Sequence, residues 1–162
     1  MKSTIVVFGS STGTCENIAN TIAEKLGVEA INVTDFSADT IANHDNLILG
    51  TSTWGAGELQ DDWYDGVNVL KDADLSGKTV AIFGCGDSES YSDTFCAAMK
   101  EIYDAAEGAN IIGSVSTDGY TFDDSDAVVD GKFIGLPLDD VNEDDKTEGR
   151  IDAWLDSIKG SL

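Results

Sequence analysis

The segment Ser10-Ser11-Thr12-Gly13-Thr14-Cys15 has the residue types of a phosphate-binding loop. It lies between a short apolar run and the start of a helical pattern. Serine and threonine hydroxyls, together with the free N–H groups of a helix N-terminus, donate hydrogen bonds to an anion. The same residues also suit a simple turn with a helix cap, so the segment by itself leaves both interpretations open.

The glycine spacing of this segment narrows the kind of phosphate that it could bind. It lacks GxxxxGK[ST] and the lysine of that motif, which neutralises the phosphates of a nucleoside triphosphate. It also lacks GxGxxG, the pattern that binds a dinucleotide. A monophosphate held by neutral hydrogen-bond donors is therefore the expected ligand.

Two further loops place an aromatic residue near glycines. The second loop consists of Thr51, Ser52, Thr53, Trp54, Gly55 and Ala56, and the third contains Cys85, Gly86, Asp87 and Tyr91. Large aromatic side chains usually belong to a core, but two of them in such loops also suit stacking against a flat aromatic ligand. Asp87 either shapes its own turn, the interpretation that we favour slightly, or adds negative charge near the ligand.

The elements that position these loops follow from the apolar pattern. Short apolar runs that end in glycine or valine predict buried strands, and they are Thr4–Gly9, Asn46–Gly50, Lys78–Gly84, Asn110–Gly113 and, more weakly, Val28–Val33. Apolar residues at steps of three and four predict helices between and after them, over Cys15–Leu26, Trp63–Leu70, Phe95–Ala106 and Ile151–Ile158, the last with Thr147 as N-cap. Strands that alternate with helices form a doubly wound parallel sheet with helices on both faces. Ligands of such sheets bind beyond the carboxyl ends of the strands, where all three loops lie.

Composition limits the classes of function. The chain of 162 residues is expected to form one domain over residues 1–162, without a leader or a membrane span. A formal charge of −22 disfavours binding to nucleic acid or to anionic membranes. This charge serves solubility, steers the protein toward a basic partner, or does both.

The three cysteines show neither a pairing pattern nor a metal-ligand pattern, which indicates free thiols in a reducing cytoplasm. We therefore expect no metal site.

Taken together, these motifs resemble the flavodoxin family over nearly the whole chain. The phosphate loop of that family has a hydroxyl residue, any residue, and then Thr-Gly-x-Thr, which matches Ser10, Thr12 and Gly13, with Cys15 in place of the last threonine. A thiol is a weak donor, so one phosphate hydrogen bond is expected to be lost there. Cys15 also falls on the apolar stripe of the first helix, and we favour a packing role for its side chain.

The resemblance implies a cofactor and a more detailed fold. FMN would bind at the three loops, with Trp54 and Tyr91 on either side of the isoalloxazine ring and the backbone around Gly55 near N5. The family's sheet has five parallel strands in the order 2-1-3-4-5. The irregular segment at about residues 116–138, with its aromatic anchors, would be the insertion that splits the fifth strand in long-chain flavodoxins.

The resemblance also implies a function. The chain would be a low-potential one-electron carrier, not an enzyme, that shuttles between the neutral semiquinone and the hydroquinone of FMN. Its partners would be basic-faced redox proteins, such as an NAD(P)H-dependent flavodoxin reductase and ferredoxin-using or nitrogenase-type acceptors, and it would act as a monomer. Glu58, Asp61 and Asp62 are candidates for docking them, or form an ordinary solvated face. An FMN-dependent NAD(P)H/quinone reductase of the same fold is the alternative, although nine lysines and arginines offer few cations for a pyridine nucleotide.

Overall fold

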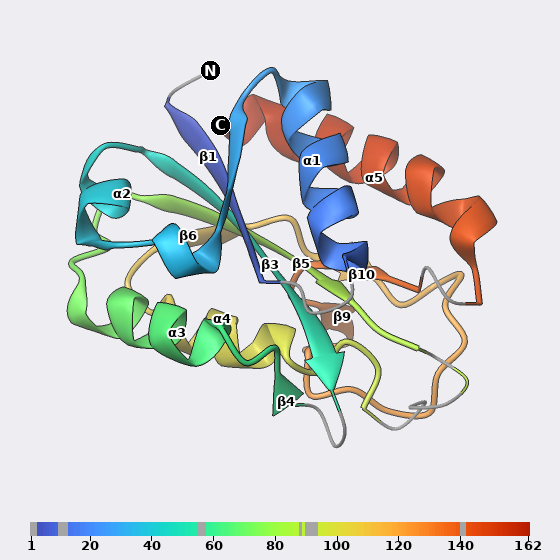
Figure 1. Cartoon of the computed structure of the whole chain (residues 1–162). Coiled ribbons are helices and arrows are strands. Elements are labelled where there is room, and N and C mark those ends of the chain that lie inside the picture. Colours follow the sequence, from blue (N-terminus) through green and yellow to red (C-terminus); the bar gives the residue numbers. More distant parts are fainter. Residues whose placement is uncertain (1–2, 10–12, 55–57, 88, 90–93, 140–141) are drawn as a thin grey trace.

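A parallel β-sheet with helices on both faces forms the centre of the chain (Figure 1). The computed structural model describes residues 3–9, 13–54, 58–87, 89, 94–139 and 142–162. The sheet has the order β10-β5-β3-β1-β2, and each neighbouring pair is parallel. These strands are β1 (Thr4–Gly9), β2 (Glu29–Asn32), β3 (Asn46–Trp54), β5 (Thr79–Cys85) and β10 (Leu136–Leu138). The predicted strand positions and the order 2-1-3-4-5 are confirmed, since β5 and β10 are the fourth and fifth strands of that scheme.

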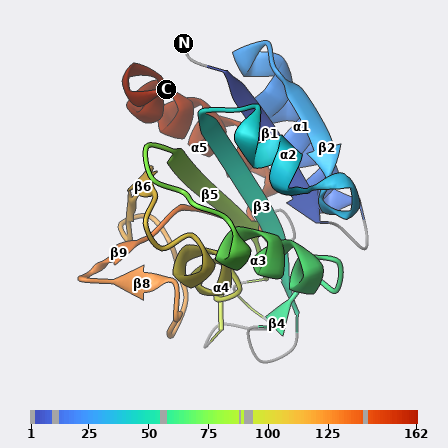
Figure 2. The ribbon, with the colours of Figure 1, turned by 90° about the vertical axis from the view of Figure 1, so that its left-hand side faces the viewer.

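Successive residues of each central strand face opposite layers, as the pleat requires. Ile5 and Val7 pack toward α3 (Trp63–Asp72) and α4 (Met99–Ala105), whereas Val6 and Phe8 pack toward α1 (Thr14–Leu26) and α5 (Asp144–Ile158). Figure 2 shows α3 and α4 on one side of the sheet and α1 and α5 on the other. Burial on both faces explains why the strands are apolar throughout. None of the helices in the described ranges is long and apolar enough to cross a membrane.

Shorter elements connect these layers. A 3₁₀ turn (Val33–Asp35) and α2 (Ala38–Ala42) lead from β2 to β3, and β4 (Glu58–Leu59) pairs antiparallel with the end of β3. A second 3₁₀ turn (Lys159–Ser161) follows α5. Two predicted helix starts were wrong: α4 begins at Met99 instead of Phe95, and α5 begins at Asp144, so Thr147 lies inside it.

The fifth strand of the sheet is split, as expected. Its first half, β6 (Asn110–Ile112), pairs with Thr79–Ala81 of β5, and its second half, β10, pairs with Phe83–Cys85. Residues 113–135 lie between the halves and contain a small antiparallel sheet of β7 (Val115–Ser116), β8 (Val128–Val129) and β9 (Lys132–Phe133). The predicted end of the insertion at residue 138 was therefore too late, because β10 belongs to the main sheet. Pro137 fits there because β10 is the edge strand of the parallel order, with β5 as its one neighbour among the described strands.

Aromatic side chains fix the insertion to the body of the protein. Phe133 is fully buried, and its ring centroid lies 5.3 Å from that of Tyr120 and 6.1 Å from that of Phe95. The guanidinium of Arg150, on α5, lies 4.0 Å above the Tyr120 ring and donates to the Gly119 carbonyl at 2.9 Å. Arg150 also donates to Glu143 at 3.1 Å. One arginine thus joins the insertion to the start of α5.

Arg150→Met should lower the free energy of unfolding by about 2 kcal/mol, because it removes a ring stack and two charge-assisted hydrogen bonds but keeps an apolar stem. Lys146→Met is the matched control, since Lys146 bonds to the same Glu143 at 2.8 Å but is 51% exposed, and such pairs contribute below about 0.5 kcal/mol. Urea unfolding of both variants measures the difference. Equal effects would show that Arg150 does not fasten the insertion.

Candidate functional site

The carboxyl ends of β1, β3 and β5 lie side by side at one edge of the sheet. Gly9 pairs with Thr51, and Thr51 and Ser52 pair with Gly84 and Cys85. From β1 the chain adds β2 on one side of that strand, and it then crosses to β3 and β5 on the other side. The strand order therefore reverses between β1 and β3, which is where open α/β sheets bind ligands. All three loops predicted to bind a ligand begin at this edge.

The first loop leads into α1 through Gly13. This residue is the N-cap, its φ of 91° is the left-handed conformation that glycine adopts readily, and its carbonyl accepts the N–H of Asn17 at 3.0 Å. Thr14 is the first residue of α1, so the N–H groups at the start of this helix lie at the ligand edge of the sheet. Ser10, Ser11 and Thr12 lie outside the described residues, and their predicted phosphate contacts stay predictions.

The side chain of Cys15 packs in the core, as we expected from the apolar stripe. The residue is 1% exposed and belongs to the apolar layer that contains Phe8 and Cys85. A hydrogen bond with the Cys85 thiol, and then burial, raise the pKa of Cys15 well above its usual value. Because the thiol is neutral and turned inward, Cys15 can offer a ligand its backbone N–H only.

The second loop starts from a strand end whose hydroxyls already have internal partners. Thr51 is fully buried, donates to the Ser52 carbonyl at 2.9 Å and accepts the N–H of Gln60 at 3.3 Å. The Thr53 hydroxyl accepts the N–H of Ala98 at 3.2 Å, which joins this loop to the segment before α4. Thr51 therefore shapes the loop, whereas Ser52 and Thr53 remain partly exposed. Gly55, Ala56 and the side chain of Trp54 lie outside the described part.

Trp63 anchors the strand from which this loop starts, a role that the sequence did not reveal. It is fully buried, and its indole N–H donates to the Gly50 carbonyl at 2.6 Å. An added Cβ at Gly9 would come within 2.5 Å of both Gln60 and Trp63. The apolar period of α3 indicated that Trp63 is buried, but nothing in the period indicated that its N–H anchors a strand beside the ligand edge.

The third loop is fixed where it leaves β5. The N–H of Gly86 donates to the Leu138 carbonyl at 2.9 Å, and the Asp87 carboxylate accepts the N–H of Glu89 at 3.1 Å. This contact between residues two apart is the turn-shaping role that we favoured for Asp87. The same carboxylate oxygen accepts the side-chain amide of Asn142 at 2.7 Å. Asn142 was not foreseen, and Tyr91 lies outside the described residues.

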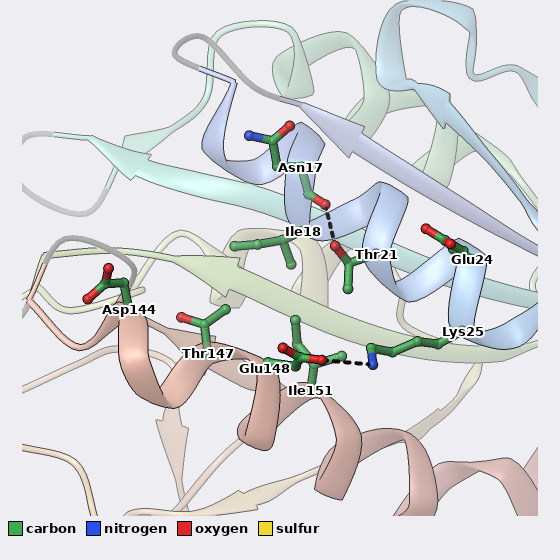
Figure 3. Close-up of a pocket in the computed structure, with 9 residues that line it drawn as sticks. All are labelled: Asn17, Ile18, Thr21, Glu24, Lys25, Asp144, Thr147, Glu148 and Ile151. Carbon is green, nitrogen blue, oxygen red and sulfur yellow. Dashed lines mark hydrogen bonds and ion pairs between the residues drawn. The ribbon is translucent and has the colours of Figure 1, made fainter.

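A separate hollow of about 680 Å³ lies between α1 and α5 (Figure 3). Polar and charged side chains line it together with Ile18 and Ile151, and Lys25 joins the two helices by an ion pair of 3.6 Å with Glu148 and another of 2.8 Å with Asp152. Among the described residues, none of those predicted to bind a ligand lines it. Within the described ranges, no group of three or more histidine, cysteine or acidic side chains is arranged to hold a metal ion.

The doubly wound sheet and its three convergent loops define a mononucleotide-binding α/β protein with its site at the switch point. The chain belongs to the flavodoxin family, whose model matches residues 6–154. It is 43% identical to Flavodoxin 1 of Azotobacter vinelandii over 93% of this chain and 91% of that protein. It is 39% identical to the Helicobacter pylori flavodoxin over 97% of this chain and 96% of that protein.

Solved structures agree with this assignment. The flavodoxin of Fusobacterium nucleatum bound to flavin mononucleotide superposes with a TM-score of 0.93 at 31% identity, covering 100% of this chain and 99% of that one. Its K13G mutant, also bound to flavin mononucleotide, gives a TM-score of 0.94 at 32% identity, covering 100% of this chain and 98% of that one. Flavodoxins are electron-transfer proteins that act with redox partner proteins, and they do not turn over a substrate.

Gly86→Ala should lower the free energy of unfolding by about 2 kcal/mol, since overpacking at a site that cannot give way costs that much. An added Cβ would lie 2.9 Å from the Cys96 backbone nitrogen and 3.0 Å from its sulfur. Gly149→Ala is the control: its Cβ meets nothing within 4 Å, so this variant should be more stable by about 0.5–1 kcal/mol. Thermal unfolding compares the stabilities of the two variants. If Gly86→Ala is as stable as the parent protein, the third loop is not closely packed on Cys96.

Proposed function

We propose that this chain binds FMN at the ends of β1, β3 and β5 and acts as a one-electron carrier. The observation that carries the proposal is the juxtaposition of the three loops at the switch point. It is supported by the flavodoxin relatives and by the two Fusobacterium structures that contain flavin mononucleotide. FMN supplies the electron chemistry, and the protein binds it, orients it and sets its surrounding charge.

The described part of the site fits a phosphate and a flat ring. Gly13, Thr14 and the N–H of Cys15 offer the neutral donors of a helix N-terminus, which suits a monophosphate. We propose that Ser10, Ser11 and Thr12 complete that end. Ser52, Thr53, Trp54, Gly55 and Ala56 would meet the ring from one loop, and Cys85, Gly86, Asp87 and Tyr91 from the other.

The charge around the third loop favours a low reduction potential. Asp87 is partly buried, and Asp139, at the end of β10, is fully buried. A second electron would place negative charge on the flavin near these carboxylates, where repulsion is weakly screened. We therefore propose that the protein cycles between the one-electron-reduced and the fully reduced forms of FMN.

The partners that we propose are basic-faced redox proteins, including an NAD(P)H-dependent reductase and ferredoxin-using or nitrogenase-type acceptors. Of the predicted docking residues, Glu58 and Asp61 are exposed beside the second loop, whereas Asp62 is half-buried and accepts the Gln60 side-chain amide at 3.0 Å. Asp65, near the start of α3, is also exposed. Tyr64 stands among them, 51% exposed. A field of one sign raises the rate of association with a partner of the opposite sign. We propose a monomer in the cytoplasm, where its three free cysteines would stay reduced.

An anaerobic dithionite titration of the FMN-loaded protein, followed by absorbance, tests this function. We expect stoichiometric FMN binding and a blue one-electron-reduced species before full reduction, and slow oxidation of NADPH unless a reductase is added. Failure to bind FMN would contradict the proposal. Rapid NADPH oxidation by the protein alone would instead support the FMN-dependent reductase.

Cys15→Thr tests the phosphate end of the site. A threonine methyl can replace the buried sulfur while its hydroxyl donates to the phosphate, and one hydrogen bond to a charged group corresponds to about tenfold tighter FMN binding. Cys15→Val has the same shape without a donor and should bind FMN no more tightly than the parent protein. Fluorescence titrations with FMN and with riboflavin, which lacks the phosphate, measure the gain. An unchanged or lower FMN affinity for Cys15→Thr would show that core packing alone determines this residue.

A further inference from the structure

We propose that Asn142 is a positioning residue for the flavin, acting through Asp87 and the third loop. The inference rests on the proposed binding of FMN and deepens it. It assigns a role at the ring end of the site to a residue that lies 55 positions away from the loop it holds.

The Asn142 side-chain amide joins two carboxylates. Its Nδ2 donates to Asp87 Oδ1 at 2.7 Å, and it also lies 3.2 Å and 3.0 Å from the two carboxylate oxygens of Asp139. An amide nitrogen has two hydrogens, so it can serve both carboxylates at once. Bonds to charged acceptors are the stronger kind of hydrogen bond. The amide therefore links the partly buried carboxylate of the third loop to the fully buried carboxylate at the end of β10.

The turn that carries Asn142 does not depend on this side chain. The backbone N–H of Asn142 donates to Asp139 Oδ1 at 3.0 Å, and the N–H of Glu143 donates to the Asp139 carbonyl at 2.9 Å. Glu143 in turn accepts from Arg150 and Lys146 on α5. These contacts remain when the amide is removed. The turn is thus a preformed platform, and the amide is its attachment to Asp87.

Both described ends of the third loop are held by the same region of the chain. Where the loop begins, Gly86 donates to the Leu138 carbonyl, and where it ends, the Cys96 thiol lies 3.7 Å from that same carbonyl. The Ser125 hydroxyl, in the insertion, donates to the Phe95 carbonyl at 2.5 Å. The Asn142 link differs from these backbone attachments because it fixes a charged side chain. It determines where the negative charge of Asp87 stands relative to the ring.

The variant that tests this inference is Asn142→Ala, measured by titration with FMN and with riboflavin. We expect affinity for both flavins to fall about tenfold, because the lost contact supports the ring end and each bond of this kind is equivalent to about that factor. The ratio of the two affinities should not change, since the phosphate end is intact. The potential for the second electron should become less negative, because Asp87 would lose one of the contacts that hold its charge beside the ring.

Two controls separate positioning from loss of stability. Asn110→Ala removes an exposed amide from β6 and should change neither the affinities nor the potential. The apoprotein of Asn142→Ala should lose about 1–3 kcal/mol of unfolding free energy, because its amide bonds to charged acceptors, and a circular dichroism spectrum equal to that of the parent would show that it is still folded during the titrations. The double variant Asp87→Ala/Asn142→Ala should bind no more weakly than Asp87→Ala alone, because residues that act through each other are not additive.

The outcomes distinguish this inference from the proposed function. If the parent protein binds neither flavin, the proposed function itself is contradicted. A parent that binds both, with an Asn142→Ala variant that has unchanged affinities and potential, would overturn only the role of Asn142. Additive losses in the double variant would also overturn it, since Asn142 would then act by a route other than Asp87.

Discussion

The parallel pairing of β1, β3 and β5 is the constraint on which the rest of the structure depends. Gly9, Thr51 and Gly84 are consecutive neighbours across the three strands. The pairing is close because Gly50 leaves room for the ring of Phe83, which an added Cβ would meet at 2.0 Å. Each strand is buried on both faces, so a shift of one residue would exchange the two layers of side chains. That register brings three loops, each short and local, to one place.

Most of the fold could be predicted because burial of a parallel strand on both faces leaves a continuous apolar run. Errors occurred where the determining contact is distant in sequence. The apolar stripe from Phe95 predicts a longer helix, but residues 95–98 form turns, and Cys96 takes a φ of 51° beside Gly86. Likewise α5 begins at Asp144, where the turn on Asp139 ends, and the local capping signal at Thr147 does not decide it. Asn142 carries no period and no motif, so only its contact with Asp87 reveals it.

The chain has few basic side chains to balance its carboxylates, and two of these basic side chains join separate secondary-structure elements. Lys25 connects α1 with α5, and Arg150 connects α5 with the insertion and with Glu143. The formal charge of −22 leaves most carboxylates to repel one another across the surface. A positive group therefore contributes most where it joins two elements that the core does not already fix. Arg150, the single arginine, is placed at such a junction and is only 14% exposed.

The two ends of the proposed flavin site depend on different ranges of the chain. The phosphate end is built within one β1–α1 unit, from residues that follow one another, which is why a motif describes it. The ring end needs contacts between distant segments: Thr53 with Ala98 across 45 positions, and Asp87 with Asn142 across 55. Closing loops of such length costs conformational entropy, which the contact must offset. The ring end therefore depends on the pairing of β10 with β5, whereas the helix N-terminus for the phosphate needs only its neighbouring strand. This difference gives the insertion a structural role, because its Tyr120 hydroxyl donates to the Pro137 carbonyl of β10 at 2.8 Å, at the edge of the sheet on which the ring end depends.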